Sequence, residues 1–371
     1  CRLIPGGHNP AEQKSMPLVA HTNLPTFERL RLEGQTVLEP NRAQQQDIRE
    51  LHIGLLNMMP DAALAATERQ FYRLVGESNQ IAQFHIHPFT LKELTRNKEG
   101  QDHVSRYYEP VEKVMEEGLD ALIITGANVT HPNLSAEPFW NPLNALIDWA
   151  TANVTSVLCS CLATHAVMQF RYGKARKAMG AKRWGVYSHR VIQQHPLVSG
   201  VNTIFDVPHS RFNNISREQF EDAGLHVLVE SEEAGVHMAV SEDGFRIVFF
   251  QGHPEYDTIS LLKEYKREAG RYIRGERPDY PPFPEHYFTI RNEAILEEYQ
   301  DRMDQARRLG DELPEFPEAL LVDTLNNTWH DTAEAVISNW IGKVYQITHR
   351  DRKLPFMDGV DPQNPLANCQ T

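Results

Sequence analysis

The segment Ser156-Val-Leu-Cys-Ser-Cys-Leu-Ala-Thr-His-Ala166 decides the fold of this chain. Its first half, up to Cys159, is a short apolar run typical of a buried strand, and its second half has the pattern of a helix. Cys161 lies at the abrupt boundary between the two. A side chain at such a turn lies at the carboxyl edge of an α/β sheet, where these folds bind their ligands. The segment therefore predicts an α/β protein with a functional group at residue 161.

The same alternation extends in both directions from this segment. We predict strands at 51–56, 81–87, 119–125, 154–159, 225–230, 237–240 and 246–250, and helices at 26–32, 62–75, 140–152, 163–172, 257–273, 290–310 and 331–346. Strands that alternate with helices favour a parallel sheet with helices on both faces. We expect one α/β domain with additional helices.

Composition divides the chain into three parts. Residues 1–50 are polar and form a predicted N-terminal arm. Met16, followed by Pro-Leu-Val-Ala, resembles the natural start of a protein, so residues 1–15 could be an expression remnant. Residues 51–350 form the predicted catalytic domain. Residues 351–371 form a C-terminal tail.

Charge and cysteine content exclude several classes of protein. The formal net charge is −13 over 371 residues, so nucleic acid is not an expected partner. No apolar run is long enough for a membrane span, and the N-terminus lacks the pattern of a secretory signal. Four cysteines, two of them in a Cys-x-Cys pair, do not form a disulfide framework. We therefore expect a cytoplasmic protein.

A local basic cluster follows the Cys-x-Cys pair. Its members are Lys174, Arg176, Lys177, Lys182 and Arg183. Such a run is usually a solvated loop or helix end, but its position after Cys161 also allows it to bind an anionic cosubstrate.

Cys161 is the candidate nucleophile. A helix that begins at this residue directs its N-terminus at the sulfur and favours the thiolate, and backbone N–H groups of the turn can stabilise an oxyanion. A cysteine at a strand end is more often a small core residue, which is how we interpret Cys159.

A second strand end supplies partners for Cys161. Gln251-Gly-His-Pro-Glu-Tyr-Asp257 follows the predicted strand at 246–250. Gly252 permits a tight turn, and Pro254 prevents further strand pairing. In an extended chain Glu255 points the same way as His253, so its carboxylate can orient the imidazole. The alternative is a surface histidine in a turn.

The Cys-His-acid arrangement is that of class I amidotransferase-like folds, and further motifs make the match more specific. Over about residues 50–350 the chain resembles the homoserine O-acyltransferases. The motifs that carry this resemblance are Leu-Leu-Asn-Met-Met-Pro (55–60) with Thr67-Glu68, Ile-Thr-Gly-Ala (124–127), Trp184-Gly-Val-Tyr-Ser-His189, Pro208-His-Ser-Arg211, Gly-His-Pro-Glu-Tyr-Asp (252–257) and Ser338-Asn-Trp-Ile-Gly-Lys-Val-Tyr-Gln346.

The resemblance implies a flavodoxin-like, class I amidotransferase-like domain and a catalytic triad. Cys161 would accept the acyl group, His253 would act as general base, and Glu255 would be its partner. The chemistry would be ping-pong transfer from an acyl-CoA to homoserine in methionine biosynthesis. Coenzyme A thioester would be a cosubstrate, with no bound cofactor and no metal, and the protein would be a homodimer.

The resemblance also implies substrate-binding residues. Lys182 matches a substrate-contacting lysine, Ser210 matches a residue that affects specificity, and Arg267 matches the arginine that holds the carboxylate of the amino acid. A planar guanidinium suits that task. Thr130 stands where acetyl-users tend to carry glutamate and succinyl-users glycine. We expect succinyl-CoA to be favoured over acetyl-CoA.

Other functions stay open at this point. Serine or another hydroxy-amino acid could replace homoserine as acceptor. The same triad could serve a glutamine amidotransferase-like hydrolase, although Ser160 and Leu162 flank Cys161 where glycine is usual. A non-catalytic binding protein on this fold is the third possibility. His85 and His87 lie on a predicted strand, and we expect them to be packing residues rather than metal ligands.

Overall fold

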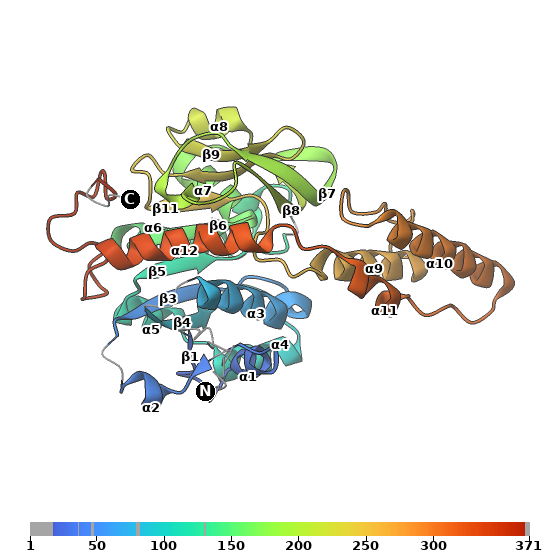
Figure 1. The fold of residues 1–371 in the computed structure, drawn as a ribbon, viewed down its shortest axis with the longest axis horizontal. Helices are drawn as coiled ribbons and strands as arrows, with labels where there is room; N and C mark the ends of the chain where they lie inside the picture. The colour runs from blue at the N-terminus through green and yellow to red at the C-terminus, as the bar shows by residue number, and fades with distance from the viewer. Residues whose placement is uncertain (1–17, 36, 46–47, 79–81, 130, 368–371) are drawn as a thin grey trace, which may run out of the picture.

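The computed structural model describes residues 18–35, 37–45, 48–78, 82–129 and 131–367. Its eleven described strands form one sheet in the order β2-β1-β4-β3-β5-β6-β11-β10-β9-β7-β8 (Figure 1). The strands are β1 (Leu18–Val19), β2 (Val37–Leu38), β3 (Glu50–Leu56), β4 (Gln83–Phe89), β5 (Ala121–Ile124), β6 (Ser156–Ser160), β7 (Lys177–Val191), β8 (Ile204–Asn214), β9 (His226–Ser231), β10 (Gly235–Val240) and β11 (Ile247–Phe250). The helices are α1 (Pro25–Leu32), α2 (Pro40–Ala43), α3 (Asp61–Glu77), α4 (Lys98–Tyr107), α5 (Val111–Glu117), α6 (Trp140–Asn153), α7 (Leu162–Tyr172), α8 (Arg217–Glu221), α9 (Ser260–Ile273), α10 (Ile290–Leu309), α11 (Glu318–Leu321) and α12 (His330–Ile347).

The centre of the sheet is parallel and has the strand order of a flavodoxin-like fold. The strands β4-β3-β5-β6-β11 are mutually parallel. Renumbered among themselves, they follow the order 2-1-3-4-5, which is the flavodoxin-like order. The predicted fold class is therefore confirmed.

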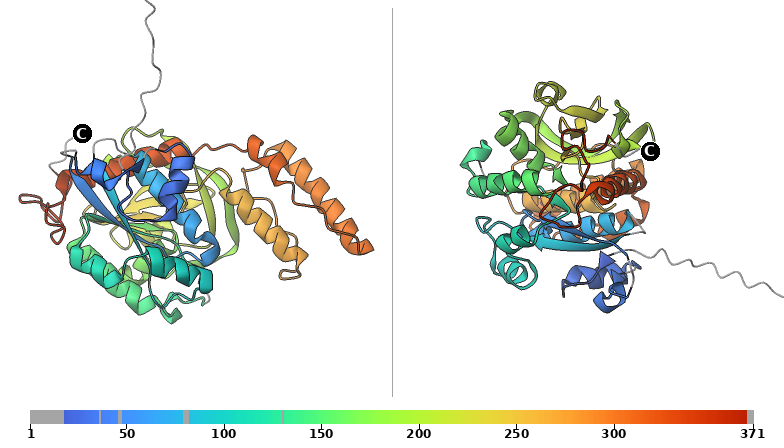
Figure 2. Two further views of the ribbon diagram at one scale, coloured as in Figure 1. Left: turned by 90° about the horizontal axis from the view of Figure 1, so that it is seen from below. Right: turned by 90° about the vertical axis from the view of Figure 1, so that its left-hand side faces the viewer.

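Helices cover both faces of this central sheet, as the alternation of strands and helices predicts. On one face, α3 and α12 bury an apolar cluster that includes Phe71 and Trp340. On the other, α6 and α7 bury a cluster that includes Leu146 and Met168. The two views of Figure 2 show these helices on opposite sides of the strands.

The other half of the sheet is antiparallel, which the expectation of a parallel sheet did not include. The pairs β11–β10, β10–β9, β9–β7 and β7–β8 are antiparallel. The basic cluster that we interpreted as a loop or helix end lies largely on β7, which spans Lys177–Val191. The first half of β7 is mostly exposed and carries charged side chains, so it has no apolar run that would identify it as a strand.

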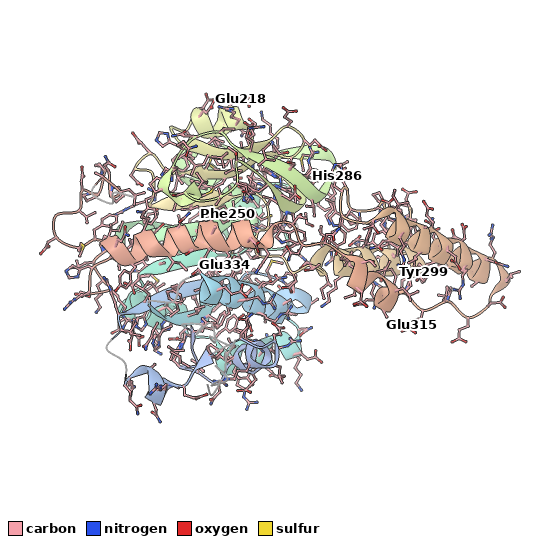
Figure 3. All side chains as sticks on the ribbon, in the orientation of Figure 1. Glu218, Phe250, His286, Tyr299, Glu315 and Glu334 are labelled. Atoms are coloured by element: carbon pink, nitrogen blue, oxygen red, sulfur yellow. The ribbon has the colours of Figure 1, made fainter. Side chains whose placement is uncertain are left out.

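A helical extension projects from the body. Figure 1 shows α9, α10 and α11 away from the sheet, and Figure 3 places Tyr299 and Glu315 on this extension. A third apolar cluster joins its base to β7 through Trp184, Tyr265 and Leu296. The predicted helices at 257–273 and 290–310 are present here.

The segments on either side of the predicted catalytic domain pack against it. In the N-terminal part β1 pairs with β4 and β2, and α1 is present where a helix at 26–32 was predicted. In the C-terminal part Phe356, Val360 and Leu366 pack against the main core. The possible expression remnant at 1–15 lies outside the described residues. Among the described helices, none is both long and apolar enough to span a membrane.

Candidate active site

Cys161 occupies a strained turn between β6 and α7. Its backbone has φ 51° and ψ −104°, and only one other described non-glycine residue has a positive φ. The Cys161 N–H donates to the Phe250 carbonyl at 2.8 Å, and the Thr164 hydroxyl donates to the same carbonyl at 2.8 Å. These bonds fix the turn against the end of β11, which offsets a cost of about 1–3 kcal/mol for such a backbone conformation.

The surroundings of the Cys161 sulfur suit an acyl group. Leu162 is the first residue of α7, so the earliest N–H groups of the helix point toward the turn. Gly126 lies on the other side, where an added Cβ would stand 3.8 Å from the Cβ of Cys161. The absence of a side chain at Gly126 leaves room beside the sulfur.

Cys159 has a different environment from Cys161. It is completely buried within β6, and burial raises the pKa of its thiol. A thiol that stays protonated is a poor nucleophile. The prediction that Cys159 is a core residue agrees with this burial.

The loop after β11 is fixed by buried hydrogen bonds. The Gln251 amide group accepts from the Ile215 N–H at 2.8 Å and donates to the Val236 carbonyl at 2.8 Å. An added Cβ on Gly252 would stand 2.6 Å from Val207 and 2.8 Å from His209, so only glycine fits there. This close packing sets the position of the residue that follows.

The structure brings Cys161, His253 and Glu255 together. His253 Nδ1 lies 2.8 Å from Glu255 Oε1, and the imidazole is close enough to the Cys161 side chain for the two to interact electrostatically. Burial alone lowers the pKa of an imidazole, but the charges of Glu255 and Cys161 outweigh it and hold the pKa of His253 well above its ordinary value. The arrangement can therefore store a proton next to the sulfur.

A buried carboxylate connects this group to two predicted binding residues. Glu264 on α9 accepts hydrogen bonds from Lys182 Nζ at 2.9 Å, from the Ser210 hydroxyl at 2.7 Å and from the Tyr256 hydroxyl at 2.8 Å. The Tyr256 ring stacks on the His253 ring with centroids 4.5 Å apart. Lys182 and Ser210 thus lie in one polar cluster beside the imidazole.

Charges within this cluster are balanced. Burial raises the pKa of Glu264, but Lys182 and the hydroxyl donors more than compensate and lower it. Burial also lowers the pKa of Lys182, against the opposing effect of Glu264.

Glu264 and Tyr256 were not identified as members of the site in the sequence analysis. Tyr256 lies within the quoted catalytic motif, which was the available signal, whereas Glu264 has the pattern of a helix-surface residue.

Arg267 lies one turn of α9 beyond Glu264. Its side chain is 57% exposed and its Nε is 3.3 Å from Glu268. Within the described part of the chain its Nη atoms form no hydrogen bond or ion pair, so they are available to a ligand. Thr130, predicted to face the acyl group, lies outside the described residues.

The rest of the basic cluster is dispersed. Lys174 pairs with Asp222, and Arg176 donates to the carbonyls of His131 and Pro132. Only Lys182 lies in the polar cluster with Glu264.

An ion-pair group anchors the loop that carries the imidazole. Asp257 binds Arg69 at 2.6 Å and Arg73 at 2.5 Å, both from α3. An open cavity of about 440 Å³ lies along this anchor, between α3 and residues 254–259. The position of His253 therefore depends on α3 as well as on β11.

Comparison with known proteins supports the resemblance seen in the motifs. A family model described as homoserine O-succinyltransferase matches residues 17–350. Homoserine O-succinyltransferase of Nitrosococcus oceani is 68% identical over 95% of this chain and 99% of its own length, and that of Allochromatium vinosum is 67% identical with the same coverage. A solved glutamine amidotransferase from Methylobacillus flagellatus is 15% identical, covers 80% of this chain and 95% of its own, and aligns with a TM-score of 0.46. A family match over most of the chain and relatives at this identity leave one conclusion: the chain belongs to the homoserine O-succinyltransferase family.

Proposed function

We propose that this enzyme transfers the succinyl group of succinyl-CoA to the hydroxyl of homoserine, through a thioester on Cys161, as a step of methionine biosynthesis. The observation that carries the proposal is the contact of Cys161, His253 and Glu255 at the carboxyl edge of a flavodoxin-like sheet. The names of the relatives that are 67–68% identical support the choice of substrates.

In the first half-reaction the Cys161 thiolate attacks the carbonyl carbon of the succinyl thioester. The N–H groups at the start of α7 stabilise the oxyanion that forms. The carbon–sulfur bond to coenzyme A then breaks, and the departing thiolate takes the proton that His253 holds. The products are free coenzyme A and the succinyl-enzyme.

In the second half-reaction His253 is the general base. Once Cys161 is acylated it carries no charge, so its contribution to the raised pKa of His253 disappears. The neutral imidazole takes the proton of the homoserine hydroxyl while the oxygen attacks the thioester. The Cys161 thiolate leaves, and its charge restores the starting state of the imidazole.

The polar cluster around Glu264 and Arg267 binds homoserine in this proposal. The Nη atoms of Arg267 can hold the α-carboxylate with two parallel hydrogen bonds. Lys182 and Ser210 lie in the cluster beside His253 through their hydrogen bonds to Glu264, and in this proposal they also contact homoserine. The acceptor hydroxyl then lies near the imidazole that deprotonates it.

The test is mass spectrometry of the intact protein after separate incubation with succinyl-CoA and acetyl-CoA. We expect the succinyl mass to appear on Cys161 and to disappear when homoserine is added, with release of O-succinylhomoserine. Discharge by serine alone would assign a different acceptor. A faster and fuller acetyl adduct would assign acetyl-CoA as donor, and release of free succinate without an acceptor would identify a hydrolase.

A further inference from the structure

A group of histidines unrelated to acyl transfer lies at the β1 edge of the central sheet. His21 follows β1, His52 lies on β3, and His85 and His87 lie on β4. Glu109 stands just before α5 and faces His87. The rings of His21 and His87 have centroids 5.0 Å apart, and those of His21 and His85 are 5.1 Å apart. None of these residues contacts the triad.

Three of these side chains have the geometry of a metal site. One ligand atom each from His21, His87 and Glu109 lies within 4.8 Å of the other two. A tetrahedral zinc site with bonds of about 2.0–2.2 Å places its ligand atoms roughly 3.5 Å apart. Small rotations of the three side chains are therefore enough to close the site around one ion.

The hydrogen bonds leave the correct nitrogen of His21 available. Its Nδ1 lies 3.1 Å from the Val19 carbonyl, so Nδ1 carries the proton and donates it. Its Nε2 then has a lone pair, and this atom is buried with no hydrogen-bond partner among the described residues.

His87 and Glu109 each have a further contact of the kind that supports the ligands of a bound metal. A metal-bound imidazole usually donates its second N–H to a nearby acceptor. His87 Nδ1 faces Glu109 at 2.6 Å, and His87 Nε2 lies 2.8 Å from His52 Nδ1, which can accept that proton. The second carboxylate oxygen of Glu109 lies 2.8 Å from Lys113 Nζ.

We propose that His21, His87 and Glu109 bind one divalent ion of the zinc, cobalt or nickel type, with His52 as the partner of His87. Two imidazoles and one carboxylate favour such an ion over magnesium or calcium. His85 packs beside this group, with its ring centroid 5.1 Å from that of His21, but it is not one of the three residues whose ligand atoms converge. For His87, the proposal departs from our expectation that His85 and His87 are packing residues.

The proposed role is structural. β1 is two residues long and pairs with β4 through a single register position. An ion shared by His21, His87 and Glu109 links the segment that follows this short strand to β4 and to the segment that precedes α5. Because the unfolded chain lacks the preformed site, binding stabilises the folded state.

The test uses the full chain after removal of metals with a chelator, in a Cys161→Ser background that removes the accessible thiol. Zinc is titrated calorimetrically, and cobalt is titrated spectroscopically. We expect one site, cobalt absorption in the visible range without a thiolate charge-transfer band, and a higher Tm in zinc. His21→Gln and Glu109→Gln should each abolish the site, and His52→Asn should weaken zinc binding roughly 10–100-fold.

The matched control is His286→Asn. His286 belongs to a second group with Glu233 and Glu285, in which all three residues are exposed. Figure 3 shows it far from β1 in the same view as Figure 1. Asparagine tolerates the positive φ of this position, so the variant should fold. It should bind zinc as the parent does.

Other outcomes overturn the proposal. If zinc binds equally well to His21→Gln and Glu109→Gln variants whose metal-free Tm and circular dichroism match the parent, the ion lies elsewhere. If the chelated parent binds neither ion, the group is an ordinary His87–Glu109 ion pair. A thiolate charge-transfer band would assign the site to a remaining cysteine.

Discussion

At the scale of single residues, the backbone conformation of Cys161 and the hydrogen bond of His253 to Glu255 carry the proposed chemistry. Both depend on neighbours distant in sequence: Phe250 fixes the turn at Cys161, and Pro208 accepts the backbone N–H of His253 at 2.8 Å. The strain at residue 161 therefore persists because the strand ends around it are rigid.

The two cysteines of the Cys-x-Cys pair should respond differently to substitution. Cys161→Ser should abolish acyl transfer and the acyl-enzyme, because an unactivated hydroxyl is a much weaker nucleophile than a thiolate. Cys159→Ser should retain most activity, because that thiol is buried and protonated. Steady-state rates and intact mass measure both. Loss of turnover in the folded Cys159→Ser variant alone would mean that the nucleophile is misassigned.

Glu255→Gln should change the pH dependence of the second half-reaction. The carboxylate raises the pKa of His253, so its removal lowers that pKa. Discharge of the acyl-enzyme needs neutral His253 and rises with pH through this pKa, so its ascending limb should move to lower pH. The maximal rate should fall because the imidazole loses its orienting partner. The measurement is single-turnover discharge of the acyl-enzyme by homoserine at different pH values. If the ascending limb of the pH–rate profile stays where it is, Glu255 does not raise the pKa of His253.

Arg267→Lys should affect only the half-reaction that involves homoserine. Lysine cannot form the two parallel hydrogen bonds of a guanidinium, so carboxylate binding should weaken by about 1–3 kcal/mol. The KM for homoserine should rise accordingly while acyl-enzyme formation stays unchanged. Equal losses in both half-reactions would indicate that Arg267 contacts coenzyme A or supports the fold instead.

The sequence allowed the proximity of Cys161, His253 and Glu255 to be predicted, because these residues follow strand ends with recognisable turns. Glu264 could not be predicted, since burial of a helix glutamate depends on Lys182, Ser210 and Tyr256 converging from other elements. The proposed histidine group could not be predicted for a similar reason. The spacing of His85 and His87 gave no sign that His21 and Glu109 complete the group.

At the scale of elements, the predicted and missed strands differ in burial. β5, β6 and β11 are buried along their whole length and read as continuous apolar runs. β7 and β8 have exposed and charged positions, and each is paired along most of its length with the other. A hairpin of this kind is specified by tertiary pairing, so a pattern search along the chain misses it.

The contact between α3 and the loop after β11 gives a prediction at this scale. Asp257→Asn removes the charge that pairs with Arg69 and Arg73, both of which are largely buried. We expect a loss of about 3 kcal/mol in the free energy of unfolding. We also expect a fall in kcat of up to about 100-fold, because displacement of His253 by about 1 Å is costly.

The control for this prediction is Glu28→Gln. Glu28 forms an exposed ion pair with Arg31 on α1, and such pairs contribute about 0–1 kcal/mol. Urea unfolding and steady-state kinetics of the two variants make the comparison. Similar small effects in both would show that Asp257 does not position the loop.

At the scale of the whole molecule, the part of the chain that follows the helical extension packs against β6, the strand that precedes Cys161. α12 runs across the body in Figure 1 and buries Trp340 against the main core. The Trp340 indole N–H donates to the Ser156 hydroxyl at 2.8 Å, and Ser156 is the first residue of β6. Residues on both sides of the extension therefore form one core with the strand that precedes Cys161.

The contact between Trp340 and Ser156 predicts that a substitution at Trp340 lowers stability without changing the rate of catalysis. Trp340→Phe removes the indole N–H and leaves a cavity, so the free energy of unfolding should fall by about 1–3 kcal/mol. Ser156 lies at the opposite end of β6 from Cys161, about 15 Å away at the usual rise per residue, so kcat should stay within about twofold, which corresponds to less than 1 kcal/mol. Urea unfolding of Trp340→Phe, Ser156→Ala and the double variant should show coupling between the two sites. Additive effects would mean that packing alone retains α12, and a large loss of kcat in the folded variant would mean that α12 acts on the active site.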